Sequence, residues 1–233
     1  VRSSGIIAAD SARMSVTRLG TFLWGLLLWG SAVQPFTVAT ASAVEPQFLR
    51  RPDIHGDQIV FTSEGDLWLG SIASRTAARI TSADGVEGSA HFSPDGASIA
   101  FSAQYDGGLD VYVMAVSGGA PRRLTWDPYG VVVQGWTADG SEILYRSQRQ
   151  DPGRRSALWA VPAAGGGARM LPIPYVEFAA MHADGARVAY VPISAEWQHW
   201  KRYRGGLADD IWLADIATGA FRRLTDDPGI DTE

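Results

Sequence analysis

Along residues 44–233, short runs of alternating hydrophobic and polar positions are separated by glycine, proline and aspartate. Alternation with a period of two is typical of half-buried β-strands, whereas an amphipathic helix would place apolar residues at i, i+3 and i+4. No stretch of this region shows the helical spacing. The pattern therefore predicts an all-β fold of short strands joined by tight turns.

The alternating runs form a repeat that occurs four times in the same order. Each unit has an apolar strand, an Asp-Gly turn, a strand with an aromatic residue at its end, a strand carrying Trp or Tyr, and a basic strand. Three turns, at 93–96, 137–140 and 182–185, are spaced by 44 and 45 residues, and a weaker copy lies at 52–57. Repeats of roughly 40–45 residues with four strands each are typical of β-propeller blades.

We therefore predict four-stranded antiparallel blades at about 47–83, 86–127, 130–173 and 175–227. A β-sandwich is the alternative that the pattern leaves open. The Asp-Gly pairs are interpreted as turn residues, since Asp caps its own turn and Gly adopts positive φ. Because the third and fourth units carry insertions and no terminal cap is visible, we expect a truncated piece of a longer propeller.

Residues 1–43 have the pattern of a secretory leader rather than of a folded domain. Met14 is the expected start, Arg18 supplies the positive charge, and residues 21–30 form a short apolar run before an Ala-Ser-Ala site at 41–43. The apolar run is too short for a comfortable membrane span, which needs about 20 residues. We expect a cleaved signal peptide and a periplasmic or secreted protein without membrane contact, the alternative being an uncleaved anchor.

Composition excludes several classes of function. The chain of 233 residues has 20 Lys and Arg against 25 Asp and Glu, a net charge of −5, which argues against nucleic acid as a partner. It has no cysteine, which excludes disulfides, thiolate catalysis and iron–sulfur ligation. We expect no cofactor.

No catalytic or metal site is predicted within the chain. Ser89 lies on an expected inner strand without the Gly-x-Ser-x-Gly elbow of hydrolases. The four histidines lack metal-ligand spacing, and the acidic pairs at 209–210 and 226–227 are interpreted as solvated strand edges or loops. We therefore assign no catalytic residue and no metal ligand. The histidines are His55, His91, His182 and His199.

An insertion at 194–206 breaks the repeat in the fourth unit and is the candidate binding site. Lys201, Arg202 and Arg204 are interleaved with aromatic residues that include Trp200. Cations beside aromatic rings can bind a peptide carboxylate or an acidic side chain. Stacking on single-stranded nucleic acid is a further use of this composition, which export disfavours. The structural alternative is that the aromatic residues cover the blade while the cations pair with nearby aspartates.

Two sets of motifs resemble known families. The Ser-Pro-Asp-Gly turn at 93–96, the strand at 110–113 and the segment at 118–125 are similar to the blades of TolB-like propellers. The segments at 48–61, 63–69 and 200–206, followed by 209–212, resemble the N-terminal six-bladed propeller of tricorn-type serine peptidases. Together the tricorn-like segments span nearly all of 47–233.

The tricorn resemblance implies a larger enzyme that degrades oligopeptides by peptide-bond hydrolysis, with its catalytic serine and histidine in a C-terminal part that this sequence does not contain. It also implies a cytoplasmic location, which the leader contradicts. Our first hypothesis is the propeller portion of an exported peptidase, acting as substrate filter and as scaffold for downstream domains. The alternative is a non-enzymatic periplasmic TolB-like propeller that binds a protein or peptide partner. A chain ending at Glu233 would have to close as four blades or assemble with itself.

Overall fold

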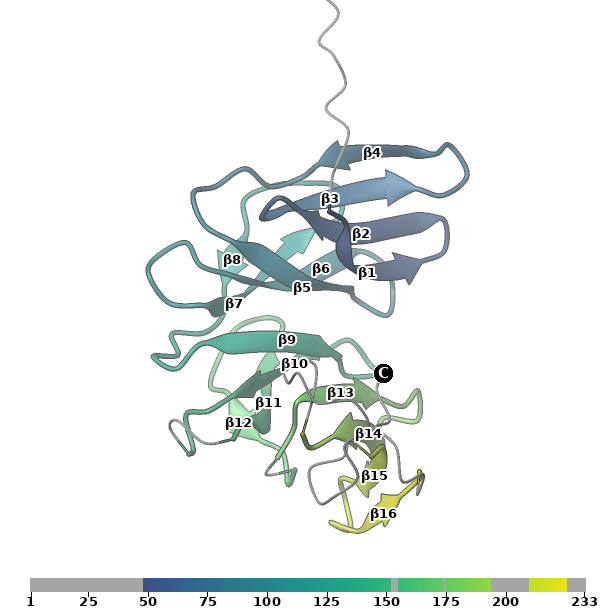
Figure 1. The fold of residues 1–233 in the computed structure, drawn as a ribbon, viewed down its shortest axis with the longest axis vertical. Coiled ribbons are helices and arrows are strands. Elements are labelled where there is room, and N and C mark those ends of the chain that lie inside the picture. The colour runs from purple at the N-terminus through teal and green to yellow at the C-terminus, as the bar shows by residue number, and fades with distance from the viewer. Residues whose placement is uncertain (1–47, 152–154, 174, 194–209, 226–233) are drawn as a thin grey trace, which may run out of the picture. The chain divides into compact units, whose positions relative to one another are not determined.

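The structure is a computed structural model that describes residues 48–151, 155–173, 175–193 and 210–225. Within these ranges every regular element is a strand, and the strands form four antiparallel sheets of four (Figure 1). In each sheet the strands pair in chain order, as in an up-and-down meander. The leader and the insertion at 194–206 lie outside the described residues. In the described part of the chain, no helix has the length and hydropathy to cross a membrane.

The four sheets follow one another along the chain. The first contains β1 (Arg50–His55), β2 (Gln58–Ser63), β3 (Asp66–Ser71) and β4 (Thr76–Arg79). The second contains β5 (Glu87–Phe92), β6 (Ser98–Ala103), β7 (Asp110–Ala115) and β8 (Arg122–Arg123). The third contains β9 (Val131–Trp136), β10 (Glu142–Ser147), β11 (Ala157–Pro162) and β12 (Arg169–Met170). The fourth contains β13 (Phe178–Met181), β14 (Arg187–Val191), β15 (Trp212–Asp215) and β16 (Phe221–Arg223).

The first strands of successive sheets are neighbours. β1 contacts β5, β5 contacts β9, and β9 contacts β13, so these four strands form the inner edge of the assembly, as Figure 1 shows for β5, β9 and β13. Four-stranded meanders that adjoin through their first strands are blades of a β-propeller. The predicted fold class is therefore confirmed.

Alternation of side chains across each strand builds the apolar layers between blades. Phe101 and its neighbour Ala100 point to opposite faces of β6. Phe101 packs in a buried cluster with Val60 and Leu67 of the first blade, whereas Ala100 packs in a cluster with residues of the third blade such as Val133. A third cluster joins the third and fourth blades. Each described blade therefore buries side chains against its neighbour in the chain.

The Asp-Gly turns have the conformation that the sequence predicted. Gly96, Gly140 and Gly185 have φ of 69°, 71° and 71°, the left-handed region that glycine adopts without strain. In the first of these turns, Asp95 Oδ1 accepts a hydrogen bond of 3.0 Å from the amide of Ala97. The same bond recurs with Asp139 and Asp184. The aspartates are therefore turn residues, as predicted.

The fourth strand of each blade ends earlier than its sequence suggested. The basic runs at 78–81 and 122–125 each end in a threonine, but β4 and β8 end two residues before it. The threonine hydroxyls of the first two blades, Thr81 and Thr125, instead accept hydrogen bonds of 2.8 and 2.9 Å from the amides of Leu67 and Val111. A side-chain oxygen thus takes the place of a backbone carbonyl at the start of the third strand.

Three of the four inner strands contain a β-bulge. The pairing register shifts between Arg50 and Asp53 in β1 and between Gly88 and His91 in β5. In β9 it shifts between Val133 and Gly135, which pair with the consecutive residues Tyr145 and Leu144 of β10. Arg51 and Ser89 have φ of 48° and 50°, although neither is glycine. Because a bulge inserts an extra residue, it changes the direction in which the following side chains point.

Candidate functional site

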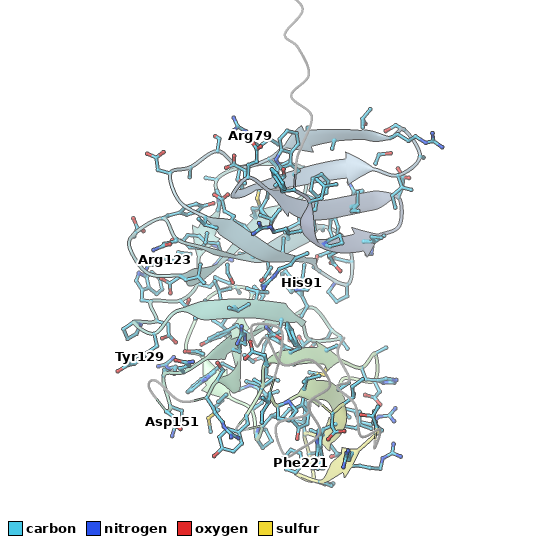
Figure 2. All side chains as sticks on the ribbon, in the orientation of Figure 1. Arg79, His91, Arg123, Tyr129, Asp151 and Phe221 are labelled. Atoms are coloured by element: carbon cyan, nitrogen blue, oxygen red, sulfur yellow. The ribbon has the colours of Figure 1, made fainter. Side chains whose placement is uncertain are left out.

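The inner strands border a cavity of about 460 Å³ that we call the inner-strand cavity. All four described blades contribute to its wall: Arg51 comes from β1, Ser89 and His91 from β5, Gln134 from β9, and Ala179 from β13. Figure 2 labels His91 on the inner strand β5, beside β9. Cavities of roughly 300–1,000 Å³ are typical of sites for small ligands.

Arg51 and Ser89 are polar residues in the wall of the inner-strand cavity. Arg51 Nη1 donates a hydrogen bond of 2.7 Å to Ser89 Oγ, which joins the first blade to the second. Both residues stand at bulges with positive φ. Non-glycine residues in this region carry strain that folded proteins tolerate where the surroundings hold them in place, often at functional sites.

His91 lies beside this pair and is held near Asp53. Its Nδ1 is 4.0 Å from Asp53 Oδ1, while Asp53 Oδ2 accepts a hydrogen bond of 2.8 Å from the amide of Phe92. Burial lowers the pKa of His91; the Asp53 carboxylate opposes this effect and the Arg51 guanidinium adds to it. The imidazole is therefore neutral at neutral pH, and Arg51 carries the positive charge in the cavity wall.

Two side chains of β9 donate or accept hydrogen bonds that connect β9 to β5 and to β13. Trp136 Nε1 donates a hydrogen bond of 2.9 Å to the carbonyl oxygen of His91. Gln134 Oε1 accepts one of 2.8 Å from the amide of Ala179. These bonds connect the second, third and fourth blades across the cavity wall. The wall is therefore fixed by hydrogen bonds as well as by packing.

Ser89 and His91 do not form a nucleophile and its base. The described contacts of Ser89 Oγ include the guanidinium of Arg51 but no bond to the imidazole. A serine nucleophile needs a base within hydrogen-bond reach to take its proton. Ser89 lies within β5, the inner strand on which the sequence placed it. The arrangement is suited to binding, since it presents a cation, a hydroxyl and an imidazole.

The binding site predicted from the sequence lies outside the described residues. Lys201, Arg202, Arg204 and Trp200 all fall in the range 194–209, between β14 and β15. Asp210, one of the aspartates proposed as a partner for these cations, is described and accepts a hydrogen bond of 2.6 Å from Arg223. That aspartate therefore already has a cationic partner within its own blade.

Asp210 and Arg223 belong to a recurring set that we call the strand-end clamp. It consists of an aspartate before or at the start of the third strand, an arginine of the fourth strand, and the threonine two residues later. Arg79 pairs with Asp66 in the first blade at 3.1 Å, and the pair recurs in the second and fourth blades. The complete sets are Asp66, Arg79 and Thr81; Asp110, Arg123 and Thr125; and Asp210, Arg223 and Thr225.

The third blade has no strand-end clamp. Ala157, Met170 and Pro172 occupy the three corresponding positions. Here the amide of Leu158 donates to the carbonyl oxygen of Ile173, at 3.2 Å, in place of a threonine hydroxyl. In all four blades an amide at the third strand thus donates a hydrogen bond to the residues that follow the fourth strand. The acceptor is a threonine hydroxyl in three blades and a backbone carbonyl oxygen in the third. The repeat in the sequence showed these residue types but not their contacts.

Glu87 is the most deeply buried carboxyl group in the described residues. Its Oε2 accepts a hydrogen bond of 3.0 Å from the Thr81 hydroxyl, and the residue has no exposed surface. Burial raises the pKa of Glu87; the neighbouring Tyr105 and Thr81 hydroxyls oppose this effect, and the negative charge of Asp66 adds to it. Because Glu87 begins β5, this group links the first blade to the second.

The raised pKa of Glu87 predicts a pH-dependent contribution to stability. The folded state holds the proton more tightly than the unfolded state, so this stabilisation is complete below about pH 4.5 and is lost as pH rises through the raised pKa. Glu87→Gln mimics the protonated acid and removes this dependence. Relative to the parent, we expect the variant to gain about 1 kcal/mol or more in free energy of unfolding between about pH 4 and pH 8.

Urea unfolding across this pH range measures the difference, with the exposed Glu64→Gln as control. Parallel stability profiles of the parent and Glu87→Gln would contradict the assignment.

Of metal sites, the described ranges hold no group of three or more His, Cys, Asp or Glu side chains placed to bind an ion.

The whole region described above matches one protein family. A family model described as the tricorn protease N-terminal β-propeller domain covers residues 46–233. The chain belongs to this family. The resemblance stated from the sequence is thereby confirmed, and the inner-strand cavity belongs to a tricorn-type propeller.

Individual relatives agree with this family. Tricorn protease homolog 1 of Streptomyces coelicolor is 36% identical over 187 residues, which cover 80% of this chain and 17% of that protein. The crystal structure of the tricorn protease aligns with a TM-score of 0.67 at 28% identity, over 80% of this chain and 19% of that one. The crystal structure of TolB from Acinetobacter baumannii aligns with a TM-score of 0.61 at 26% identity, over 76% of this chain and 43% of that one. This tricorn-type propeller thus spans less than a fifth of Tricorn protease homolog 1 and of the tricorn protease chain.

Proposed function

We propose that this chain is the propeller portion of an exported tricorn-like serine peptidase, in which it admits oligopeptides and supports the downstream catalytic domains. The observation that carries the proposal is the family match over residues 46–233, together with a cavity lined by the inner strands of four blades. In the described wall of the cavity, Ser89 is hydrogen-bonded to Arg51 and has no described bond to His91 that would make it a nucleophile. Peptide-bond hydrolysis would therefore take place elsewhere in the complete protein, through an acyl-enzyme.

Export is part of this proposal and rests on residues 14–43. A positive charge, a short apolar run and an Ala-Ser-Ala site follow one another there, as in signal peptides. A reporter enzyme that is active only outside the cytoplasm, fused after Ala43, tests it. Activity of the fusion supports export, and activity only after disruption of the cells overturns it.

Peptide binding is tested with the complete 233-residue chain and an octapeptide that has a free carboxyl terminus. We expect saturable binding by calorimetry without cleavage of the peptide. Because Arg202 and Arg204 can pair with the carboxylate, Arg202→Ala combined with Arg204→Ala should weaken binding about tenfold and leave the unfolding midpoint unchanged. Arg222→Ala, on an exposed strand, is the matched control.

Equal octapeptide affinity in the parent and the double variant would overturn the role of Arg202 and Arg204. No binding of octapeptide to the parent would overturn the peptide-filter function. It would favour the alternative of a non-enzymatic propeller that binds a folded protein. The structural likeness to TolB is the observation behind that alternative.

A further inference from the structure

A second cavity, of about 540 Å³, lies between the second and third blades and shares no lining residue with the inner-strand cavity. Residues of the Asp-Gly turns at 93–96 and 137–140 form part of its wall, and residues of β7 and β8 form another part. We call it the turn-face cavity. Its volume is typical of sites for small ligands. Turns and outer strands, rather than inner strands, thus form most of this second site.

The wall of the turn-face cavity has charged groups of both signs. Asp95 and Asp139 come from the two turns, and Arg122 comes from β8. The hydroxyl two residues before each aspartate and the amide two residues after it donate hydrogen bonds that lower the pKa of both carboxyl groups, for Asp139 to about 2. Both are therefore ionised at neutral pH. Neither has an ion pair in the described part of the chain, whereas Asp184, at the same turn position of the fourth blade, pairs with Arg187 at 2.6 Å.

These charged groups keep hydrogen-bonding capacity for a ligand. Asp95 Oδ1 accepts bonds from the Ser93 hydroxyl at 2.6 Å and from the Ala97 amide at 3.0 Å, whereas its Oδ2 has no described hydrogen bond. Arg122 Nη2 donates to the carbonyl oxygen of Ala163 in the third blade, and its other N–H groups have no described acceptor. A guanidinium has five N–H donors, and a carboxylate has about four acceptor sites. The wall therefore offers donors and acceptors together.

Contacts between the two blades hold the wall in place. Trp136, which lines the cavity from β9, donates from Nε1 to the carbonyl oxygen of His91 in β5 at 2.9 Å. The two turns also touch, since a Cβ atom at Gly140 would lie 3.4 Å from Cδ of Pro94. A wall that is already ordered loses little conformational entropy when a ligand binds. The turn-face cavity is in this sense a preformed site.

The remaining wall is apolar and largely buried. Val113 and Met114 of β7 are 9% and 4% exposed, and Trp136 is 8% exposed. These side chains favour contact with C–H groups. An anion in the cavity would meet two carboxylates, and a cation would meet the guanidinium. A neutral ligand with several hydroxyl groups and an apolar face avoids both repulsions and can use the donors and the acceptors.

We propose that the turn-face cavity binds a sugar ring through adjacent hydroxyl groups, with Asp95, Asp139 and Arg122 as the hydrogen-bonding residues. A carboxylate has two oxygens side by side, and a guanidinium has paired N–H groups, so each can bond to two neighbouring hydroxyls. The C–H face of the ring would contact Met114 and Trp136. A free monosaccharide and a residue of a polysaccharide share this chemistry. The site is independent of the peptide-filter function.

The test uses calorimetric titration of the complete chain with glucose, galactose, mannose and N-acetylglucosamine. We expect at least one to bind with a dissociation constant of about 1–10 mM, as the number of atoms in a hexose allows. The fully O-methylated form of that sugar keeps the ring but lacks hydroxyl donors, and it should bind at least tenfold more weakly. A tetrasaccharide of the same sugar distinguishes a polysaccharide ligand from a free monosaccharide. Butylammonium serves as the cationic probe.

Two variants assign the binding to the turn-face cavity. Asp95→Asn combined with Asp139→Asn keeps the side-chain oxygens that accept from the turn amides, and Arg122→Gln changes an exposed strand. Each should weaken sugar binding at least tenfold, because charge-assisted bonds are lost. The matched controls are Asp184→Asn and Arg222→Gln, at the same positions of the fourth blade and outside the cavity, and both should bind as the parent does. Unfolding midpoints show that each variant folds.

Each outcome bears directly on the sugar site. Tighter binding of the tetrasaccharide than of the monosaccharide supports a polysaccharide ligand, and equal affinity supports a free sugar. No binding of any of the four sugars to the parent overturns the site, as does equal affinity for the O-methylated form. Sugar binding that survives in both the double aspartate variant and Arg122→Gln also overturns it. Tighter binding of butylammonium than of every sugar would show that the two carboxylates select a cation instead.

Discussion

Asp110→Ala is expected to lower the free energy of unfolding by about 3–5 kcal/mol, because it removes one member of a buried, hydrogen-bonded ion pair. The Asp110 side chain is 1% exposed. Its Oδ2 accepts from Arg123 Nη2, and its Oδ1 accepts from the Thr125 hydroxyl at 2.7 Å and from the amide of Asp127 at 2.9 Å. The substitution leaves these donors buried without their acceptor, which costs more than the net value of the bonds.

The matched control is Asp210→Ala, which removes the same member of the strand-end clamp from the fourth blade. Arg223 there is 42% exposed, so water can replace the aspartate, and we expect a loss of at most about 1 kcal/mol. Urea unfolding of the complete chain, monitored by tryptophan fluorescence, measures both variants. Equal losses of unfolding free energy in the two variants would show that burial does not determine how much the strand-end clamp stabilises the chain.

Phe101→Ala is expected to destabilise the chain by about 3–5 kcal/mol, since it empties a fully buried site between the first two blades. Phe101 has no exposed surface, and its ring centroid lies 6.0 Å from that of Tyr112. Because Phe101 packs with Val60 and Leu67, the substitution loosens the contact between two blades rather than one sheet alone. Hydrogen exchange should therefore accelerate in β2 and β3 as well as in β6.

Two further variants serve as controls for the loss of stability in Phe101→Ala. Phe101→Leu keeps most of the volume and should cost less than about 1.5 kcal/mol. Phe221→Ala, at a side chain of the fourth blade that is 44% exposed, should cost less than about 1 kcal/mol. Faster exchange confined to β6 in Phe101→Ala would show that the blades unfold independently.

The repeat made the architecture predictable from the sequence. Local chemistry fixes each Asp-Gly turn: Asp95 bonds to an amide two residues later, and Gly96 adopts a conformation that other residues avoid. Such rules depend on neighbouring residues alone, so they can be applied without a structure. The spacing of the turns then gave the blade length. Four sheets of four strands followed from these local features.

The contacts of the fourth strands could not be predicted in the same way. Thr81 and Thr125 follow basic runs that alternate like strands, but their hydroxyls bond to amides fourteen residues earlier in the chain. Whether a hydroxyl or a carbonyl meets that amide depends on the path of the chain in three dimensions. The third blade illustrates the point, since Ile173 supplies a carbonyl there.

The inner-strand cavity was missed for a different reason. A strict alternation assigns each residue to one face of its strand, but the bulges at Arg51 and Ser89 change this assignment. Neither position has the glycine that would signal positive φ. The arginine and the serine are also 38 residues apart, and only the packing of two blades brings them together. The cations at 201–204 were found instead because they are adjacent in the sequence.

The links between blades have a consequence for synthesis of the protein on the ribosome. The amide of Glu87 donates to the carbonyl oxygen of Gly65, and the amides of Val131 and Val176 make the equivalent bonds to Leu109 and Ser156. In each case the start of one blade, or a residue just before it, bonds to the residue that precedes the third strand of the preceding blade. A nascent chain that has emerged only as far as Thr81 therefore lacks the partner of the Gly65 carbonyl group, although β1 to β4 are all present. The hydrogen bonds of each blade become complete only after translation of the next has begun, so the blades mature from the N-terminus with a delay of one inner strand.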